Sequence, residues 1–213
     1  MGLENLLRCG LLGFVCLSIT ANAENTENTE TAAQRLHLLL KPINSLSADF
    51  TQQIIGQDNN QLQRLTGNLS LKKPNQLRWN VVSPMPQLVM SDGKLVWLYD
   101  PDLEQVVIQS FSDDFMSNPI SILLGDLDQL NRDFTVSLIS NDRFSLKPKQ
   151  KNSLFVTIQL RFIDSVLNRI DYQDNFGQNT QLTLSQVKLN PQFAKTAFVF
   201  DIPQAVDIIN HAR

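Results

Sequence analysis

Alternation of apolar and polar residues recurs along this chain and constrains its fold more than any other feature. Residues 65–72, 134–138 and 156–162 carry apolar side chains at alternating positions, with polar residues between them. This period of two predicts β-strands with one face on a core and the other in water. Turn-forming sequences separate the apolar stretches at spacings typical of an antiparallel meander: 58–60, 73–75, 92–93, 101–102, 140–142 and 175–177. Within 182–189 the apolar phase slips by one residue, which predicts a β-bulge near residues 185 and 186.

A helix is predicted near the start of the chain, where Thr31 is a suitable N-cap and Pro42 limits the helix length. Its apolar face consists of Ala32, Leu36, Leu39, Leu40 and Ile43. Residues 118–131 predict one or two further short helices, with Pro119 near a helix start and Gly125 at a helix end. A long antiparallel sheet must curl or close to protect its edges. The predicted fold is therefore mainly β with helices (α+β), a curved, unclosed antiparallel β-barrel of about 10–11 strands covered by a lid of about 2–3 helices.

The N-terminal segment predicts export. Arg8 precedes an apolar run, 9–19, which is shorter than the roughly 20 residues needed to span a bilayer. An A-x-A cleavage site then ends at Ala23, so residues 1–23 are interpreted as a cleaved signal peptide. A short membrane anchor is the alternative interpretation.

The rest of the chain predicts one domain. The polar, repetitive segment 24–31 predicts a disordered mature N-terminus. No linker or charge block divides 32–213, which is interpreted as a single domain. Both cysteines, Cys9 and Cys16, lie inside the signal segment, and neither follows the small residue that precedes an acylated cysteine. The mature protein is therefore expected in the periplasm, without a disulfide or a lipid anchor.

Residues able to perform catalysis or hold a metal are sparse. The two histidines, His37 and His211, stand far apart in the sequence, and no motif pairs a nucleophile with a base. The acidic pair at 113–114 fits a solvated turn, and Asp126 and Asp128 lack the run of oxygen ligands of a calcium loop. A net charge of −3 without a basic stripe argues against nucleic acid as a partner. The sequence thus predicts neither an enzyme nor a cofactor.

Two strands are apolar on both faces. Residues 95–99 and 106–108 are continuous apolar runs, unlike the alternating strands elsewhere. One interpretation places such a strand beneath a helix. The other places one face on the core and the opposite face on an apolar cavity. Periodicity alone does not choose between them.

Two longer motifs resemble the signature of the LolA family of outer-membrane lipoprotein carriers. The first runs from Gly67 to Trp79 and contains a strand, a Lys-Lys-Pro-Asn turn and a second strand ending in Trp. The second runs from Gln87 to Asp100, with Ser-Asp-Gly-Lys leading into Trp-Leu-Tyr, and continues through 103–106. Weaker similarity lies at 48–52, 119–124 and 198–208. The ordered set covers most of 30–210 and is more specific than any one motif.

The resemblance implies a non-enzymatic carrier. A family member is expected to be a periplasmic monomer without a cofactor that binds the acyl chains of lipoproteins. An ABC-type complex of the inner membrane would release this cargo to the carrier, which would deliver it to an outer-membrane receptor. Burial of acyl chains removes about 0.8 kcal/mol of exposure cost per CH₂.

Resemblance and pattern together suggest the cargo site. Its candidate residues are Leu77, Trp79, Leu88, Met90, Trp97 and Tyr99, with Leu77 near the cavity mouth. Each of them could instead be an ordinary core residue. Leu77 stands where the family often has Phe, and Lys73 stands where it usually has Arg. The resemblance implies that Lys73 biases a helical lid during transfer, and the alternative is a solvated turn lysine.

Three other functions share parts of this pattern. The outer-membrane receptor of the same pathway has the same fold, but it is anchored by a lipid-modified cysteine. A periplasmic module that senses lipoproteins for a regulatory response usually contains a further domain. A hydrolase would need a nucleophile paired with a base, and no motif of this sequence contains such a pair.

Overall fold

The structure, a computed structural model, describes residues 30–111, 119–123 and 127–212. No helix within these residues is long and apolar enough to cross a membrane. Several sequence-based predictions concern residues outside them. These are the signal peptide 1–23, nearly all of segment 24–31, the acidic pair 113–114 and Asp126.

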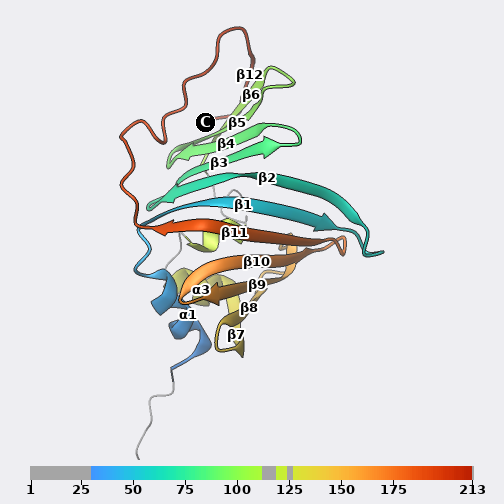
Figure 1. The fold of residues 1–213 in the computed structure, drawn as a ribbon, viewed down its shortest axis with the longest axis vertical. Helices are drawn as coiled ribbons and strands as arrows, with labels where there is room; N and C mark the ends of the chain where they lie inside the picture. The colour runs from blue at the N-terminus through green and yellow to red at the C-terminus, as the bar shows by residue number, and fades with distance from the viewer. Residues whose placement is uncertain (1–29, 112–118, 124–126, 213) are drawn as a thin grey trace, which may run out of the picture.

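A single twelve-stranded sheet forms most of the described chain (Figure 1). The spatial order is β12-β6-β5-β4-β3-β2-β1-β11-β10-β9-β8-β7. The first six strands are β1 (Ser45–Ile55), β2 (Gln61–Lys72), β3 (Gln76–Ser83), β4 (Gln87–Asp92), β5 (Leu95–Asp100) and β6 (Gln105–Ser110). The others are β7 (Phe134–Ser140), β8 (Arg143–Pro148), β9 (Phe155–Ile163), β10 (Val166–Asp174), β11 (Asn179–Leu189) and β12 (Asp207–Asn210).

The sheet curves without closing. Among the described residues, its edge strands β7 and β12 pair only with β8 and β6 respectively, so the barrel remains open. Every ladder is antiparallel except the parallel one between β12 and β6. The predicted unclosed antiparallel barrel is confirmed. The strand number exceeds the expected ten or eleven, and the short β12 is one strand that alternation did not reveal, since Asp-Ile-Ile-Asn has no period of two.

The connections between strands contain the residues that their backbones need. Asn59 and Asn75 both have a φ of 61°, in the left-handed region that asparagine tolerates better than most residues. The carboxylate of Asp92 accepts hydrogen bonds from the backbone N–H groups of Lys94 and Leu95, at 2.7 and 2.9 Å. These side chains stabilise the tight turns that the sequence predicted, so consecutive strands lie next to one another.

The helices pack on one face of the sheet (Figure 1). Helix α1 (Ala32–Leu40) begins with a capping box, in which Thr31 and Gln34 satisfy each other's backbone N–H groups. A 3₁₀-helix, η1 (Pro119–Leu123), and the short helix α3 (Leu127–Asp133) follow β6 in the chain. Both predicted helical regions are therefore confirmed.

The main core lies between these helices and the inner face of the sheet, defined as the face that the helices cover. It joins Leu36 and Leu40 of α1 and Leu123 of η1 with inner-face residues such as Leu46 and Leu71. The predicted bulge in β11 is present. The β1–β11 register shifts between the pairs Ser47–Lys188 and Asp49–Ser185, and Gln186 has a φ of 51°.

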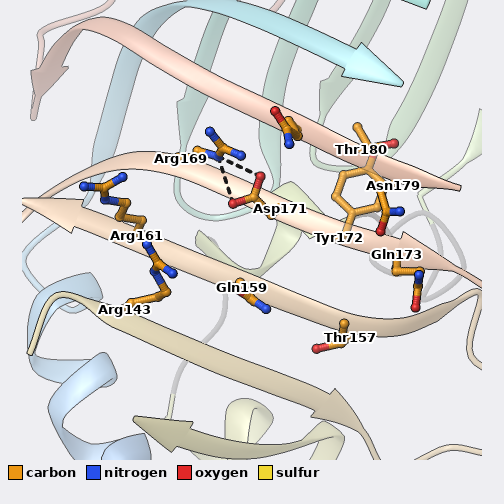
Figure 2. A pocket seen from close by; sticks show the side chains of 11 residues that line it. Arg143, Thr157, Gln159, Arg161, Arg169, Asp171, Tyr172, Gln173, Asn179 and Thr180 are labelled. Atoms are coloured by element: carbon orange, nitrogen blue, oxygen red, sulfur yellow. Dashed lines mark hydrogen bonds and ion pairs between the residues drawn. The ribbon is translucent and has the colours of Figure 1, made fainter. Parts of the chain in front are cut away.

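The opposite, outer face of the sheet differs from one end of the sheet to the other. Over β8 to β11 it is lined by polar and charged side chains (Figure 2). Over β4 to β6 it is apolar, and the C-terminal segment between β11 and β12 covers it. Phe200 of that segment has its ring centroid 6.1 Å from Trp97 and 5.8 Å from Tyr99.

Candidate functional site

The apolar inner face becomes more exposed with distance from α1. Along β1, Leu46 is fully buried and Phe50 is buried, whereas Ile54 is half-buried. Other inner-face residues also pack against the core while remaining partly exposed: Leu65, Trp79, Val136, Phe155 and Tyr172. The structure thus presents a largely apolar surface, buried under the helices at one end and accessible toward the other.

Glycine at position 67 permits close packing on this surface. Gly67 lies between Phe50 of β1 and Val81 of β3 in the sheet register. A Cβ there would come within 2.0 Å of the Asn80 carbonyl oxygen, so no other residue fits without a shift of the strands. Over this gap the rings of Phe50 and Trp79 stack with centroids 4.0 Å apart. The two rings form an aromatic platform within the inner face.

Aromatic residues also pack together at the start of β9 and near the end of β10. Phe155 and Tyr172 meet edge to face, with centroids 5.1 Å apart. Burial raises the pKa of the Tyr172 phenol, and a hydrogen bond with Thr180 partly opposes this shift. The phenol therefore remains neutral over a wider pH range than a tyrosine in water.

Two of the six predicted cargo residues lie on the inner face. Leu77 is opposite Leu71, and Trp79 is opposite Leu69, both inner-face residues of β2. Leu77 is 3% exposed and belongs to the core, whereas Trp79 is partly exposed beside Phe50. The structure brings these two predicted residues together.

The other four lie on the outer face. Residues directly opposite each other on neighbouring strands share a face of the sheet. Met90 lies opposite Arg78, which points away from the inner face because it stands between the inner-face residues Leu77 and Trp79 in β3. Leu88 and Met90 in turn pair with Tyr99 and Trp97 of β5. These four side chains form a second apolar cluster beneath the C-terminal segment, on the far side of the sheet from Trp79. The strand at 95–99 thus has its inner face on the core side and its outer face under that segment.

Lys73 lies in the β2–β3 turn beside the end of α1. Its ammonium donates a long hydrogen bond, 3.4 Å, to the carbonyl oxygen of Leu40, the last residue of the helix. Its backbone N–H donates to the carbonyl of Asn44 at 2.8 Å. The last carbonyls of a helix have no intrahelical partner, and a cation is favourable at that end of the helix dipole. Lys73 therefore contacts the helix that covers the inner face.

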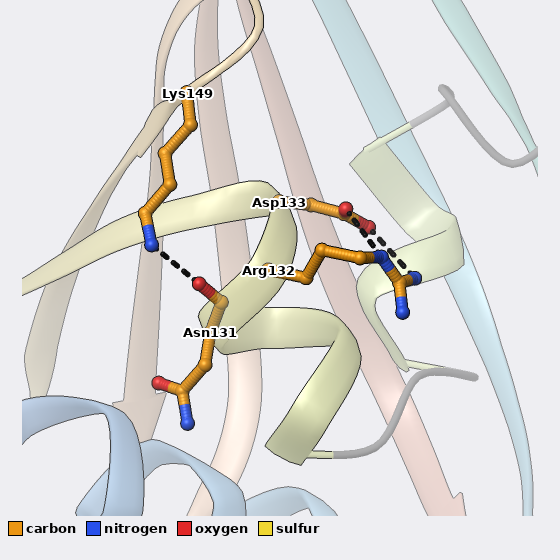
Figure 3. Close-up of polar contacts among 4 residues, drawn as sticks. All are labelled: Asn131, Arg132, Asp133 and Lys149. Carbon is orange, nitrogen blue, oxygen red and sulfur yellow. Dashed lines mark hydrogen bonds and ion pairs between the residues drawn. The ribbon is translucent and has the colours of Figure 1, made fainter.

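Polar contacts also fix both helices at their ends. The Asn190 side chain accepts hydrogen bonds from the N–H groups of Asn44 and Ser45 and donates to the Pro42 carbonyl, which joins the α1–β1 connection to the end of β11. The Lys149 ammonium donates to the Asn131 carbonyl of α3 (Figure 3).

The inner face offers apolar contact and little reactive chemistry. Among the described residues, the buried polar residues are Ser45, Ser91 and Thr180. In the same part of the chain, no group of three or more His, Cys, Asp or Glu residues could hold a metal ion. The arrangement suits binding of an apolar ligand. Sequence reasoning missed Phe50, Leu65, Phe155 and Tyr172. Alternation in phase with buried neighbours was a usable signal for Phe50, Leu65 and Tyr172. Phe155 is out of phase with the buried Ile158 and Leu160, and it reaches the inner face through a register shift between β9 and β10.

Comparison with known proteins gives consistent results. A family model described as "Outer membrane lipoprotein carrier protein LolA" matches residues 41–201. An outer-membrane lipoprotein carrier protein of Pseudomonas paraeruginosa is 38% identical over 181 residues, which cover 84% of this chain and 87% of the relative. The protein of the same description from Azotobacter vinelandii is 35% identical over 207 residues, which cover 96% and 98%.

Solved structures share the fold. An uncharacterized conserved protein from Thermus thermophilus superposes with a TM-score of 0.54 at 13% identity, covering 84% of this chain and 98% of that one. A LolA superfamily protein from Nitrosomonas europaea gives a TM-score of 0.50 at 14% identity, covering 80% and 98%. At these identities the likeness concerns the fold alone.

Proposed function

The chain belongs to the LolA family of outer-membrane lipoprotein carriers, and we propose that it holds the acyl chains of its cargo on the inner face of the open barrel. As a member of this family it is a lipoprotein carrier that binds and transports, and it is not an enzyme. The observation that supports the proposed binding face is the largely apolar surface that extends from the buried core to the partly exposed Trp79, Phe155 and Tyr172.

Physical chemistry favours this face. Each acyl CH₂ removed from water contributes about 0.8 kcal/mol, so a lipid-modified protein needs an apolar surface to cross an aqueous compartment. Release requires that this surface also have a competing occupant. The helices supply one, because Leu36, Leu40 and Ile120 already pack on the core side of the same surface. We therefore propose that acyl chains enter by displacing helix contacts and leave when the helices return.

The route of the cargo forms the finer part of the proposal. The carrier would act in the periplasm after removal of residues 1–23 and would work as a monomer. It would receive lipoproteins from an inner-membrane ABC-type complex and pass them to an outer-membrane receptor. Lys73, at the end of α1, would bias the equilibrium between covered and open states of the inner face.

The two tryptophans allow a direct test of the binding face. The chain contains only Trp79 and Trp97, which lie on opposite faces of the sheet. Trp97→Phe leaves the inner-face tryptophan alone, and Trp79→Phe leaves the outer-face one alone. Each variant is titrated with a synthetic triacylated lipopeptide whose acyl chains contain bromine, a contact quencher of tryptophan fluorescence.

We expect strong quenching in Trp97→Phe and little in Trp79→Phe. The unbrominated lipopeptide is the control for indirect changes in fluorescence, and circular dichroism of both variants checks the fold. Quenching of Trp97 alone would place the acyl chains under the C-terminal segment, on the outer face. Absence of quenching in both variants, with binding detected by co-elution, would also contradict the inner-face proposal.

A further inference from the structure

Three arginines stand in one row across the outer face of the sheet (Figure 2). Arg161 of β9 lies directly opposite both Arg143 of β8 and Arg169 of β10. Neighbouring strands are roughly 4.8 Å apart, and like charges directly opposite one another destabilise a sheet. The whole chain has a net charge of −3, so a general excess of basic residues does not explain the row.

Two carboxylates compensate part of this charge. The Nε–H of Arg169 donates to both oxygens of Asp171, at 2.7 and 2.8 Å. Arg161 lies 4.0 Å from the Asp142 carboxylate, which accepts a shorter hydrogen bond, 2.6 Å, from the Ser140 hydroxyl. Only Arg169 is therefore closely paired.

The remaining donors point to an external anion. The Arg143 guanidinium makes no hydrogen bond, and no ion pair within 4.0 Å, with any residue that the structure describes. At longer range its charge, like that of Arg161, adds to the Ser140 hydrogen bond in lowering the pKa of the Asp142 carboxyl. In the described part of the chain, Arg161 contacts Asp142 through its Nε atom, and Arg169 donates to Asp171 through its Nε–H. The terminal nitrogens of both guanidinium groups take no part in these contacts. A guanidinium has five N–H donors in a fixed fork that matches a carboxylate. The row thus retains terminal N–H groups and one positive charge beyond its two carboxylates.

The row forms one end of a polar hollow of about 420 Å³. Next along the strands lie Gln159, Asp171 and Gln181 in register, followed by Thr157, Gln173 and Asn179. Side-chain amides both donate and accept hydrogen bonds, as the backbone of an extended peptide does. The hollow is therefore cationic at one end and peptide-like in its hydrogen bonding along its length.

We propose that this hollow binds an extended acidic segment of a partner protein. Its carboxylates would lie on the arginine row, and its backbone would follow the amide rows. A lone phosphate or a lipid head group would engage the arginines and leave the amides without partners. Membrane binding through charge relies on clusters of 4–8 basic residues, more than this row supplies. The inference does not depend on the proposed carrier function, because the arginine row and the amide rows lie on the opposite face of the sheet from the proposed cargo site, although Tyr172 also borders the hollow.

The test uses the mature protein and a short fluorescein-labelled peptide of alternating glutamate and serine, with a glutamine-serine peptide as the uncharged probe. Fluorescence anisotropy gives the affinity at low and high salt. Arg143→Gln and Arg161→Gln should each weaken glutamate-peptide binding by roughly tenfold or more, the effect of one lost charge-assisted contact. The matched control is Lys147→Gln, which removes an exposed charge from the same face of β8, outside the hollow.

Two further variants separate geometry from charge. Arg161→Lys keeps the charge but loses the fork, so it should restore binding only in part. Gln159→Ala should weaken binding of the peptide without affecting inorganic phosphate, which is measured as a competitor. Retained uptake of the brominated lipopeptide in all variants would show that the fold and the cargo site are intact.

Several outcomes would overturn the proposal. If Lys147→Gln weakened binding of the glutamate peptide as much as Arg143→Gln does, the attraction between peptide and protein would be non-specific. Binding to phosphatidylglycerol vesicles in preference to the peptide would assign the row to a membrane. Full competition by phosphate, with Gln159→Ala neutral, would reduce the hollow to a simple anion site. Self-association abolished by Arg143→Gln would make a second copy of this chain the occupant.

Discussion

Replacing Lys73 by leucine should slow delivery of cargo while leaving loading intact. The Lys73 ammonium reaches the Leu40 carbonyl at 3.4 Å, which is long for a hydrogen bond and only partly shielded from water. A charge-assisted bond of ideal length contributes about 1.5–3 kcal/mol, so this one is expected to contribute about 1 kcal/mol. That energy corresponds to a roughly fivefold change in the ratio of covered to open inner face.

The sign follows from the competition between helix and cargo. Without Lys73 the covered state loses stability, so a larger fraction of the carrier is ready to bind and the apparent affinity for acyl chains rises by up to about fivefold. Release to an acceptor should slow by a similar factor. Lys73→Arg should be near neutral or faster in delivery, because a guanidinium can reach more than one carbonyl at the end of α1.

The assay follows transfer of a fluorescent lipoprotein from purified carrier to acceptor membranes, with loading scored separately by co-purification. Lys72→Leu is the matched control, since it removes the neighbouring charge from an exposed position that does not face α1. If Lys73→Leu delivers cargo as fast as the parent protein, the residue is an ordinary turn lysine and the lid-bias reasoning is wrong.

Three further predictions concern the inner face. Gly67→Ala should lower the stability by about 1–3 kcal/mol in thermal unfolding, because the added Cβ would lie 2.0 Å from the Asn80 carbonyl oxygen. Leu65→Glu should reduce lipopeptide uptake by roughly tenfold or more, because it places a charge against the acyl chains, with little change in melting temperature. The control Thr66→Glu, on the outer face, should leave uptake unchanged. Because burial raises the pKa of Tyr172, the unfolded chain ionises first, so stability should fall as pH rises past about 10. Tyr172→Phe should remove that fall in denaturant titrations.

Local sequence patterns predicted the strands and turns well. A strand with one wet face needs polar residues at alternate positions, so 65–72 and 156–162 could be recognised without any knowledge of their partners. The bulge at Gln186 was also predictable from the sequence, since an inserted residue shifts the alternation of apolar residues by one position. The N-cap residue Thr31 likewise predicted the start of helix α1.

Pairing between strands was beyond the reach of these patterns. Alternation shows that Leu88 and Met90 share a face, but it does not show whether that face is the one used by Trp79. The short connection 84–86 sets the register, and it places Met90 opposite Arg78. The run at 95–99 is apolar at every position, so it contains no phase from which the face of Trp97 could be read. The predicted cargo site therefore combined residues from both faces.

The parallel edge strand was missed for another reason. β12 has four residues and pairs with β6. Between β11 and β12 the chain crosses the apolar outer surface of β4 to β6, where Phe200 packs near Trp97 and Tyr99. Its apolar residues Ile208 and Ile209 are adjacent rather than alternating. Its position depends on contacts of Phe200 with Trp97 and Tyr99, which are distant in sequence.

The ladder between β1 and β11 has a consequence for how the protein folds. Strands β1 to β6 and β7 to β11 are each joined to their sequence neighbours by short connections, whereas Leu46 of β1 pairs with Leu189 of β11. Bringing such distant residues together costs more chain entropy than closing a hairpin, so contacts of this kind form late. We expect two locally assembled meanders to join at this seam in the slowest step. Until then, both halves of the surface that later holds lipid are open to water, and the nascent carrier itself needs protection from aggregation.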